Sequence, residues 1–237
     1  MSIDIPVVFI PALGSDARLW KPIADILDNR IDSMVVRGAG DSIEAMADSV
    51  LEQSPPEFFL VGNSMGGYVA LEIALRKPGR LRGLTLLNSS AIAADPDRHA
   101  NSERLIEKVR AGEFEQAVGT ISRAVAPQRP DISALAATMA LDLGSEIFVE
   151  QQTAVMNRRD RRSELAALDV PTLVVAGEQD AITPVALSSD LAESLPDADL
   201  VILPGVGHLS TLEAPEIVGL KLFSWWSRQA ELSRTER

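Results

Sequence analysis

The sequence predicts an α/β fold built on a mainly parallel sheet of about six strands. Short apolar runs recur along the 237 residues, and each run is closed by turn residues. The runs are continuous rather than alternating, as expected for strands that are buried on both faces of a parallel sheet. Helical patterns separate most of them, and strands that alternate with helices indicate βαβ units. The predicted strands are residues 6–10, 33–36, 58–61, 84–87, 172–176 and 200–203.

Sequence signals place several helices between these runs. An apolar stripe recurs at helical spacing over residues 43–51, and Asp41, with an acidic residue three positions later, predicts the start of this helix. Thr183 before a first-turn proline predicts a capped helix that continues to about residue 195. Ser210 and Glu213 have the spacing of a capping box, which predicts another short helix.

One long stretch contains helical patterns only. Between about residues 91 and 164 apolar positions recur at helical spacing, and no strand candidate interrupts them. We therefore expect a helical cap over residues 91–164, inserted after the fourth strand, and a core formed by residues 1–90 and 165–237. The last residues, 231–237, are expected to form a polar tail.

Composition excludes several classes of function. The formal net charge of −12 disfavours nucleic acid and anionic membrane surfaces as partners. With no cysteine and only two histidines, disulfides, thiolate chemistry and a multi-histidine metal site are not expected, and no metal or organic cofactor is implied. The chain shows neither a signal peptide nor a stretch of ~20 apolar residues, so we expect a cytoplasmic protein. Nothing in the composition indicates the oligomeric state.

A serine stands in a pattern that is typical of a nucleophile. Gly62-Asn63-Ser64-Met65-Gly66 is G-x-S-x-G, and it follows a predicted buried strand and precedes a helical pattern over residues 68–76. Such a strand–turn–helix is so tight that its flanking positions require glycine, and it lifts the serine above the sheet. A glycine-rich turn that serves only close packing is the alternative reading of these residues.

A serine hydroxyl needs a neighbouring base that accepts its proton. His208 directly follows the last predicted strand, and Asp180 follows the fifth, so both stand at carboxyl ends of strands. Since the carboxyl ends of parallel strands share one edge of the sheet, His208 is the candidate base. Asp180 is the candidate acid, which would fix the tautomer of the imidazole and stabilise its charged form.

Rival residues exist for both roles. His99 lies in the polar start of the helical stretch, which indicates a solvated helix end rather than a site. Glu178 comes too early in its turn, and Asp190 falls inside the following helix. Asp180 itself could be a surface turn residue.

The negative charge that forms during attack on a carbonyl needs hydrogen-bond donors. The backbone N–H of Met65, at the start of a helix, is one candidate. The second is expected from the loop after the first strand, where Pro11 has no N–H, so that Leu13, or less favourably Ala12, is the candidate.

These segments resemble the α/β-hydrolase superfamily across nearly the whole chain. The resemblance implies the α/β-hydrolase fold, with Ser64, Asp180 and His208 as a catalytic triad in the chain order that this fold uses. The chain looks most like the compact capped members: 3-oxoadipate enol-lactonases, small carboxylesterases, meta-cleavage C–C hydrolases and the menaquinone-pathway cyclohexadiene carboxylate synthase. The matching segments are residues 9–15, 62–67, 170–180 and 205–209.

Two features depart from the pattern of these relatives. Most have His-Gly where this chain has Pro11-Ala12, which bears on the second oxyanion donor. The chain also begins directly at the strand that is usually the third, so the two antiparallel edge strands of larger members are expected to be absent.

The resemblance leaves three functions open. Hydrolysis of a small carboxylic ester or lactone through an acyl-serine is the first hypothesis. C–C bond hydrolysis or elimination by the same triad is the second, and a ligand-binding protein without turnover is the third. Four arginines within residues 158–162 could anchor an acidic substrate beneath the cap, although a salt-bridged helix end is the more common arrangement.

Overall fold

The protein is built around one six-stranded parallel sheet. The computed structural model describes residues 3–235, and the strand order is β2-β1-β3-β4-β5-β6, with every neighbouring pair parallel. The predicted fold class is thereby confirmed, and each predicted apolar run lies within a strand or ends one residue beyond it. The strands are β1 (Ile3–Ile10), β2 (Ile31–Val35), β3 (Phe58–Asn63), β4 (Leu81–Leu87), β5 (Thr172–Gly177) and β6 (Ala198–Leu203).

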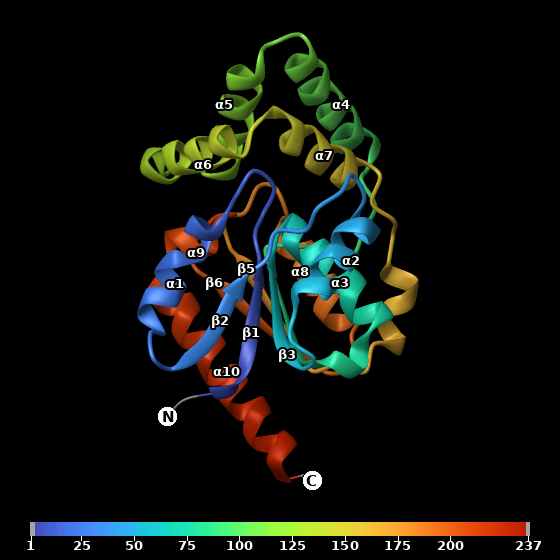
Figure 1. Ribbon diagram of the computed structural model, residues 1–237, viewed down its shortest axis with the longest axis vertical. Helices are drawn as coiled ribbons and strands as arrows, with labels where there is room; N and C mark the ends of the chain where they lie inside the picture. Colours follow the sequence, from blue (N-terminus) through green and yellow to red (C-terminus); the bar gives the residue numbers. More distant parts are fainter. Residues whose placement is uncertain (1–2, 236–237) are drawn as a thin grey trace.

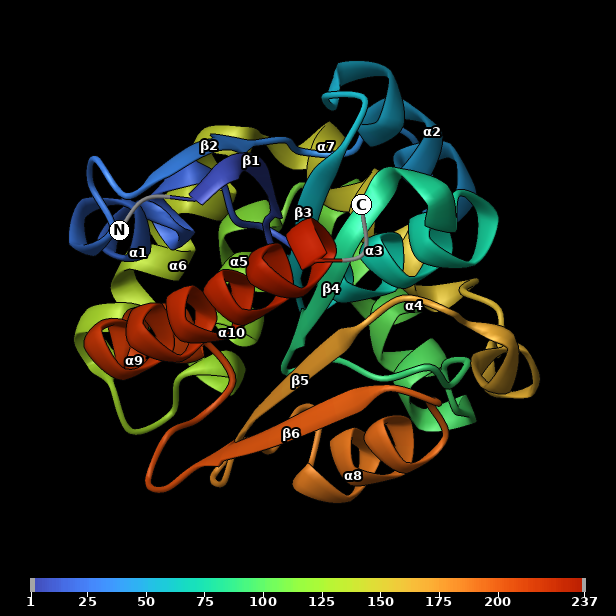
Figure 2. The ribbon, with the colours of Figure 1, turned by 90° about the horizontal axis from the view of Figure 1, so that it is seen from below.

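Helices cover both faces of the sheet, as Figure 2 shows. One face carries α1 (Lys21–Ile26) and α10 (Pro215–Thr235), whose apolar side chains form one core with Phe9, Phe59 and Trp226. The opposite face carries α2 (Ile43–Gln53), α3 (Met65–Arg76) and α8 (Val185–Glu193), which form a second core. β3 and β5 are buried along their whole length, which explains why each carries a continuous apolar run rather than an alternating pattern.

Four helices lie between β4 and β5. They are α4 (Pro96–Arg110), α5 (Phe114–Val125), α6 (Pro130–Leu143) and α7 (Ser145–Met156). In Figure 1 they stand above one end of the sheet, opposite the two chain termini. We call α4–α7 the helical insert. Within the described chain no single helix is long and apolar enough to span a membrane. The consecutive helices α6 and α7 meet these criteria only when they are counted as one segment, and the chain bends by 107° between them.

The topology itself marks a place for a site. The chain passes from β1 to β2 on one side, then returns to place β3 on the other side of β1. In open parallel sheets this reversal leaves a crevice at the carboxyl ends of the two strands concerned. Here the crevice lies between the loop after β1 and the turn after β3.

The short elements are the 3₁₀ turns Ala17–Leu19, Pro78–Arg80 and Arg162–Ala167, and the one-turn helix α9 (Ser210–Glu213). Helix starts and ends differ from the sequence predictions in three places. Ser42, rather than Asp41, caps α2, because its hydroxyl accepts the Ala45 N–H. Thr183 does not cap α8, which begins at Val185 and ends at Glu193. The expected polar tail is helical as far as Thr235, since α10 continues to that residue, and residues 236–237 lie outside the described chain.

Candidate active site

Ser64 stands at a sharp turn between β3 and α3. Its backbone has φ 53° and ψ −114°, a conformation that residues with a side chain rarely adopt. The Ser64 N–H donates to the Leu87 carbonyl at 2.9 Å, which ties the turn to the end of β4. The side chain therefore leaves the sheet at its carboxyl edge, and the strained backbone is held by the neighbouring strand.

The glycines of this turn are required by close backbone approach. A Cβ on Gly62 would lie 2.1 Å from the Gly66 carbonyl oxygen, and a Cβ on Gly66 would lie 2.3 Å from the Ile10 carbonyl oxygen. Both contacts are with backbone atoms, which cannot move aside as a flexible side chain can. The G-x-S-x-G spacing is thus a steric requirement for bringing α3 against β1.

The structure brings Ser64, His208 and Asp180 into one hydrogen-bonded row. His208 Nε2 is 2.9 Å from Ser64 Oγ, and His208 Nδ1 is 2.8 Å from Asp180 Oδ2. Because an ionised carboxylate only accepts, Nδ1 carries the proton of a neutral His208. Nε2 is then the free acceptor that faces the serine hydroxyl. The three residues come from the ends of β3, β5 and β6.

Asp180 is held in an unusually complete set of donors. Its Oδ1 accepts the N–H groups of Ile182 and Thr183, at 2.8 and 2.9 Å. Its Oδ2 accepts the Thr183 hydroxyl at 2.6 Å and the Asn88 amide at 2.9 Å, besides His208. Burial by itself raises the pKa of Asp180, but the bond and charge of His208, followed by the Thr183 bonds, outweigh it, so the pKa lies below its ordinary value.

The loop that carries His208 is fastened by two further residues. Glu213 accepts the N–H groups of Gly207 and Leu209, at 2.7 and 3.0 Å. Asn88 donates to the Gly207 carbonyl and accepts the Ser210 hydroxyl. The predicted helix at residues 210–213 is present. Ser210 and Glu213, however, do not form the expected capping box, and their side chains position the His208 loop instead.

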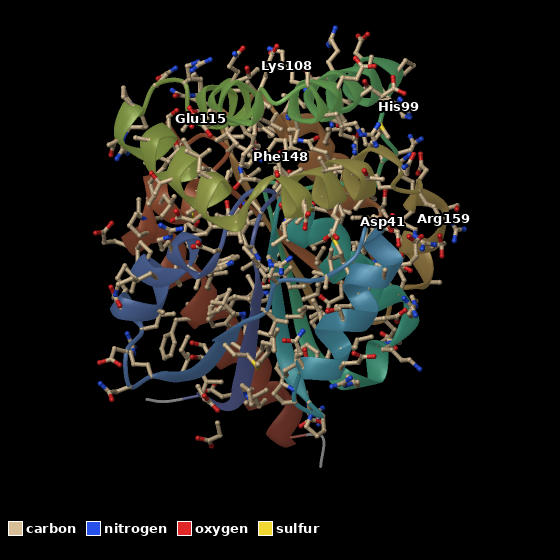
Figure 3. The ribbon with its side chains drawn as sticks, turned by 45° about the horizontal axis from the view of Figure 1, so that its top comes forward. Asp41, His99, Lys108, Glu115, Phe148 and Arg159 are labelled. Atoms are coloured by element: carbon tan, nitrogen blue, oxygen red, sulfur yellow. The ribbon has the colours of Figure 1, made fainter. Side chains whose placement is uncertain are left out.

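The rival residues lie elsewhere. The His99 side chain is 41% exposed and faces Glu103 on α4, and Figure 3 shows it on the outer part of the helical insert. Glu178 accepts the Gly205 N–H, and Asp190 lies within α8. None of them joins the row of Ser64, His208 and Asp180.

The loop after β1, residues 11–15, forms one side of the site, and we call it the oxyanion loop. Leu13 and Met65 both line the cavity next to Ser64. Met65 is the first residue of α3, where helical N–H groups have no acceptor within the helix. The next amide of the loop, that of Gly14, is already engaged, because it donates to Gln151 Oε1 of α7 at 2.7 Å. Leu13 and Met65 thus line the same space as Ser64, and the helical insert holds the loop through Gln151.

A cavity of about 410 Å³ opens at Ser64 and His208. Its floor is formed by the oxyanion loop and the start of α3, and its roof by the helical insert. The wall from α5 and α6 is mainly apolar, with Ile121, Val125 and Ala136 among its side chains. The wall from α4 and α7 is polar. This volume and mixture of surfaces are typical of a small-molecule site.

The arginines of residues 158–162 do not act as one cluster. Arg161 pairs with Glu72, Glu44 and Glu164, and Arg162 pairs with Asp160. Arg159 is exposed on the outer side of the molecule (Figure 3). Arg158 alone lines the cavity. The salt-bridged arrangement therefore holds for two of the four.

Sequence reasoning missed Asn88, Gln151 and the role of Thr183. Asn88 directly follows β4, so a polar residue at the carboxyl end of a buried strand was the available signal. Gln151 lies 137 residues from its partner Gly14, and nothing in either local sequence indicates that contact. Among the described residues, no group of three or more potential ligand side chains could hold a metal ion.

Comparisons with known proteins agree with this fold. A family model described as the alpha/beta hydrolase fold matches residues 5–215. A pimeloyl-[acyl-carrier protein] methyl ester esterase from Yersinia enterocolitica is 30% identical over 235 residues, covering 90% of each chain. A putative carbamate hydrolase, RutD, from Agrobacterium fabrum is 27% identical and covers 94% of this chain and 93% of its own.

A solved structure is similar over almost the whole chain. A thermophilic esterase from Thermogutta terrifontis, with malate bound, superposes with a TM-score of 0.85 at 26% identity. The match covers 97% of this chain and 92% of that one. At this coverage the similarity includes both the strands of the sheet and the helical insert.

Proposed function

The chain belongs to the alpha/beta hydrolase family, and we propose that it hydrolyses a small carboxylic ester or lactone through an acyl-serine intermediate on Ser64. The observation that carries the proposal is the continuous row from Ser64 Oγ through His208 to a buried, ionised Asp180. A row of this kind turns a weak hydroxyl into a nucleophile by giving its proton a defined acceptor.

The first half of the reaction forms the acyl-enzyme. Ser64 Oγ attacks the substrate carbonyl carbon as its proton passes to His208 Nε2. The imidazolium that results is stabilised by Asp180, whose Oδ2 accepts the Nδ1–H. Collapse of the tetrahedral intermediate breaks the bond to the alcohol oxygen, which takes the proton from Nε2 and leaves.

The oxyanion of that intermediate is assigned to the N–H groups of Met65 and Leu13. Two features support the assignment: both residues line the cavity beside Ser64, and the Met65 amide lies in the first turn of α3, where the helix dipole favours negative charge. The Leu13 amide follows Pro11-Ala12 in a loop that Gln151 fixes through Gly14. No histidine–glycine pair is needed for this arrangement.

Deacylation repeats the same proton transfers with water. His208 Nε2 accepts a proton from water as its oxygen attacks the acyl carbonyl, and the second tetrahedral intermediate releases the acid and regenerates the Ser64 hydroxyl. The products are one carboxylic acid and one alcohol, or a hydroxy acid where the substrate is a lactone.

We assign residues 91–164 to a cap and residues 1–90 and 165–237 to the catalytic core. The helices of the insert all fall within the first range, and together with the core they enclose the cavity. The relatives named as esterases and as a carbamate hydrolase favour attack on a carboxylic or carbamic carbonyl over the other chemistry that this fold supports.

Hydrolysis of p-nitrophenyl acetate tests the proposal. Wild type should release p-nitrophenol with a burst equivalent to the enzyme concentration, or at steady state if deacylation is fast. Ser64→Ala and His208→Ala should both lose at least about 10³-fold in kcat. Full activity in Ser64→Ala would exclude Ser64 as the nucleophile. Turnover of a C–C substrate that needs His208 but forms no acyl-enzyme would favour C–C cleavage or elimination.

A further inference from the structure

Arg158 is a buried cation without an acidic partner. Its residue surface is 6% exposed, and burial lowers the pKa of its guanidinium, which still stays protonated. Nε donates to the Ile92 carbonyl at 2.9 Å and Nη1 donates to the Val155 carbonyl at 2.7 Å. Nη2 makes a longer hydrogen bond, 3.4 Å, to the Ala93 carbonyl. No carboxylate forms an ion pair with it anywhere in residues 3–235. Buried charges in proteins are normally paired directly, whereas Arg158 has no direct ion pair and feels the negative charge of Asp95 at longer range.

Arg158 stands over the substrate cavity. Its guanidinium lies 4.6 Å from the ring centre of Tyr68, and both residues line the cavity that Ser64 lines. Tyr68 is one helical turn beyond Ser64 on α3, a rise of about 6 Å. One substrate in this cavity can therefore contact both Ser64 and Arg158.

Gln152 brings a second unused donor to the same wall. It is 2% exposed and lines the cavity, and its Nε2 has no acceptor among the described residues. Gln152 and Val155 belong to the last turns of α7, Arg158 lies two residues beyond its end, and all three line the cavity. A buried amide without a partner is costly, and a ligand oxygen would remove that cost.

The charge of this end of the cavity is positive. Arg98 of α4 also lines it and repels Arg158, while Asp95 forms an ion pair with Arg98 and attracts Arg158 at longer range. The Ile182 carbonyl accepts a further hydrogen bond from Arg98. Among the described residues that line the cavity, Asp97 is the one acid, and it is exposed. An anion therefore fits this end, whereas an apolar group fits the α5–α6 wall.

We propose that the substrate is an ester or lactone whose acyl or alcohol part carries a carboxylate, bound by Arg158 with Gln152 as a second donor. The inference rests on the proposed ester hydrolysis and adds its substrate class. A carboxylate is flat and offers two oxygens, which suits the remaining N–H groups of a guanidinium and a neighbouring amide. Arg158 and Gln152 are specificity residues here, because they contact the far end of the substrate rather than the reacting atoms.

A matched series of methyl esters tests the proposal. Monomethyl succinate, glutarate and adipate are compared with methyl butyrate, valerate and hexanoate, in which a methyl group replaces the carboxylate. Wild type should favour the anionic member of at least one pair by tenfold or more in kcat/KM, which is the worth of a charge-assisted hydrogen bond. Arg158→Gln should lower this ratio about tenfold, chiefly through KM, and Gln152→Leu should lower it less.

Arg162→Gln is the matched control, because Arg162 is exposed and pairs with Asp160 outside the cavity. It should leave both rates and their ratio unchanged. A second measurement does not depend on turnover: free glutarate should raise the unfolding temperature of wild type and of Ser64→Ala, and this rise should be absent or strongly reduced in Arg158→Gln. If Arg158→Gln fails to fold, Gln152→Leu replaces it in both assays.

The two proposals fail in different ways. A wild type that hydrolyses the neutral esters through Ser64, prefers them at every chain length and gains nothing from glutarate would overturn the carboxylate proposal alone. A protein that hydrolyses no ester but gains stability from glutarate in an Arg158-dependent way would overturn ester hydrolysis and leave a carboxylate site.

Discussion

Replacing Asn88 by aspartate places a second carboxyl beside Asp180. Asn88 Nδ2 lies 2.9 Å from Asp180 Oδ2, so in Asn88→Asp the two charge centres would be about 4 Å apart. At an effective dielectric constant of about 20, two like charges at that distance repel by about 4 kcal/mol. This corresponds to about three pKa units, so the pKa of one carboxyl should rise from about 4 to about 7.

The new carboxyl, rather than Asp180, should hold the added proton. Asp180 accepts bonds from His208, from Thr183 and from two backbone amides, and its pKa is already below its ordinary value. The introduced group has fewer donors, namely the Ser210 hydroxyl that Asn88 accepts in wild type. Its pKa is thus raised in the folded state relative to the unfolded state.

The sign of the pH dependence follows from linkage. An acid with a raised folded pKa carries no penalty below its unfolded pKa, and the penalty grows as pH rises towards the folded value. The free energy of unfolding of Asn88→Asp relative to wild type should therefore fall by about 4 kcal/mol between pH 4 and pH 8. Urea unfolding at several pH values measures it, with Asn88→Ser as the uncharged control, whose deficit should not depend on pH. An Asn88→Asp deficit that is constant from pH 4 to pH 8 would mean that the two carboxyl groups do not repel each other in the folded protein.

Three further predictions concern the turn, the oxyanion loop and the acid. Gly66→Ala should destabilise the folded state by at least about 3 kcal/mol or prevent folding, because the new Cβ would lie 2.3 Å from the Ile10 carbonyl oxygen. Gly79→Ala is the control: a Cβ there has no neighbouring atom within 4 Å, so the unfolding temperature should change little. Gln151→Leu leaves the buried Gly14 N–H of the oxyanion loop without an acceptor, so it should lower the free energy of unfolding in urea by about 1–3 kcal/mol and slow the acylation of Ser64. An unchanged acylation rate would mean that this hydrogen bond stabilises the fold without positioning the oxyanion loop. Asp180→Asn should be less stable than wild type at neutral pH, because a carboxyl whose pKa is lowered by folding stabilises the folded state only while it is ionised. The difference in the free energy of unfolding should shrink as pH falls below about 4. A difference that stays constant down to pH 2 would contradict the lowered pKa of Asp180.

Patterns that are local in sequence predicted most of the fold. Strands buried on both faces carry continuous apolar runs, so β3, β4 and β5 could be located from such runs in the sequence. Helix ends were less predictable, because one polar side chain can serve several local partners. Thr183 has the position of a cap, yet its hydroxyl donates to Asp180, and this bond is decided by where the end of β5 lies.

The candidate site was predictable where sheet topology decides it. Ser64, Asp180 and His208 each follow a strand, and the carboxyl ends of parallel strands meet at one edge. The contacts of the helical insert were not predictable in this way. Gln151 reaches the oxyanion loop only through the tertiary packing of α7, and Arg158 looked the same as its neighbours Arg159 and Arg162 until burial distinguished it.

The proposed chemistry requires that His208 activate Ser64 as a nucleophile. Intact-mass analysis after treatment with a fluorophosphonate tests it most directly, since the probe reacts with an activated serine whatever the natural substrate is. We expect one adduct on the wild type, none on Ser64→Ala, and strongly slowed labelling of His208→Ala. A wild type that stays unlabelled, or a Ser64→Ala protein that still gains the adduct, would contradict it.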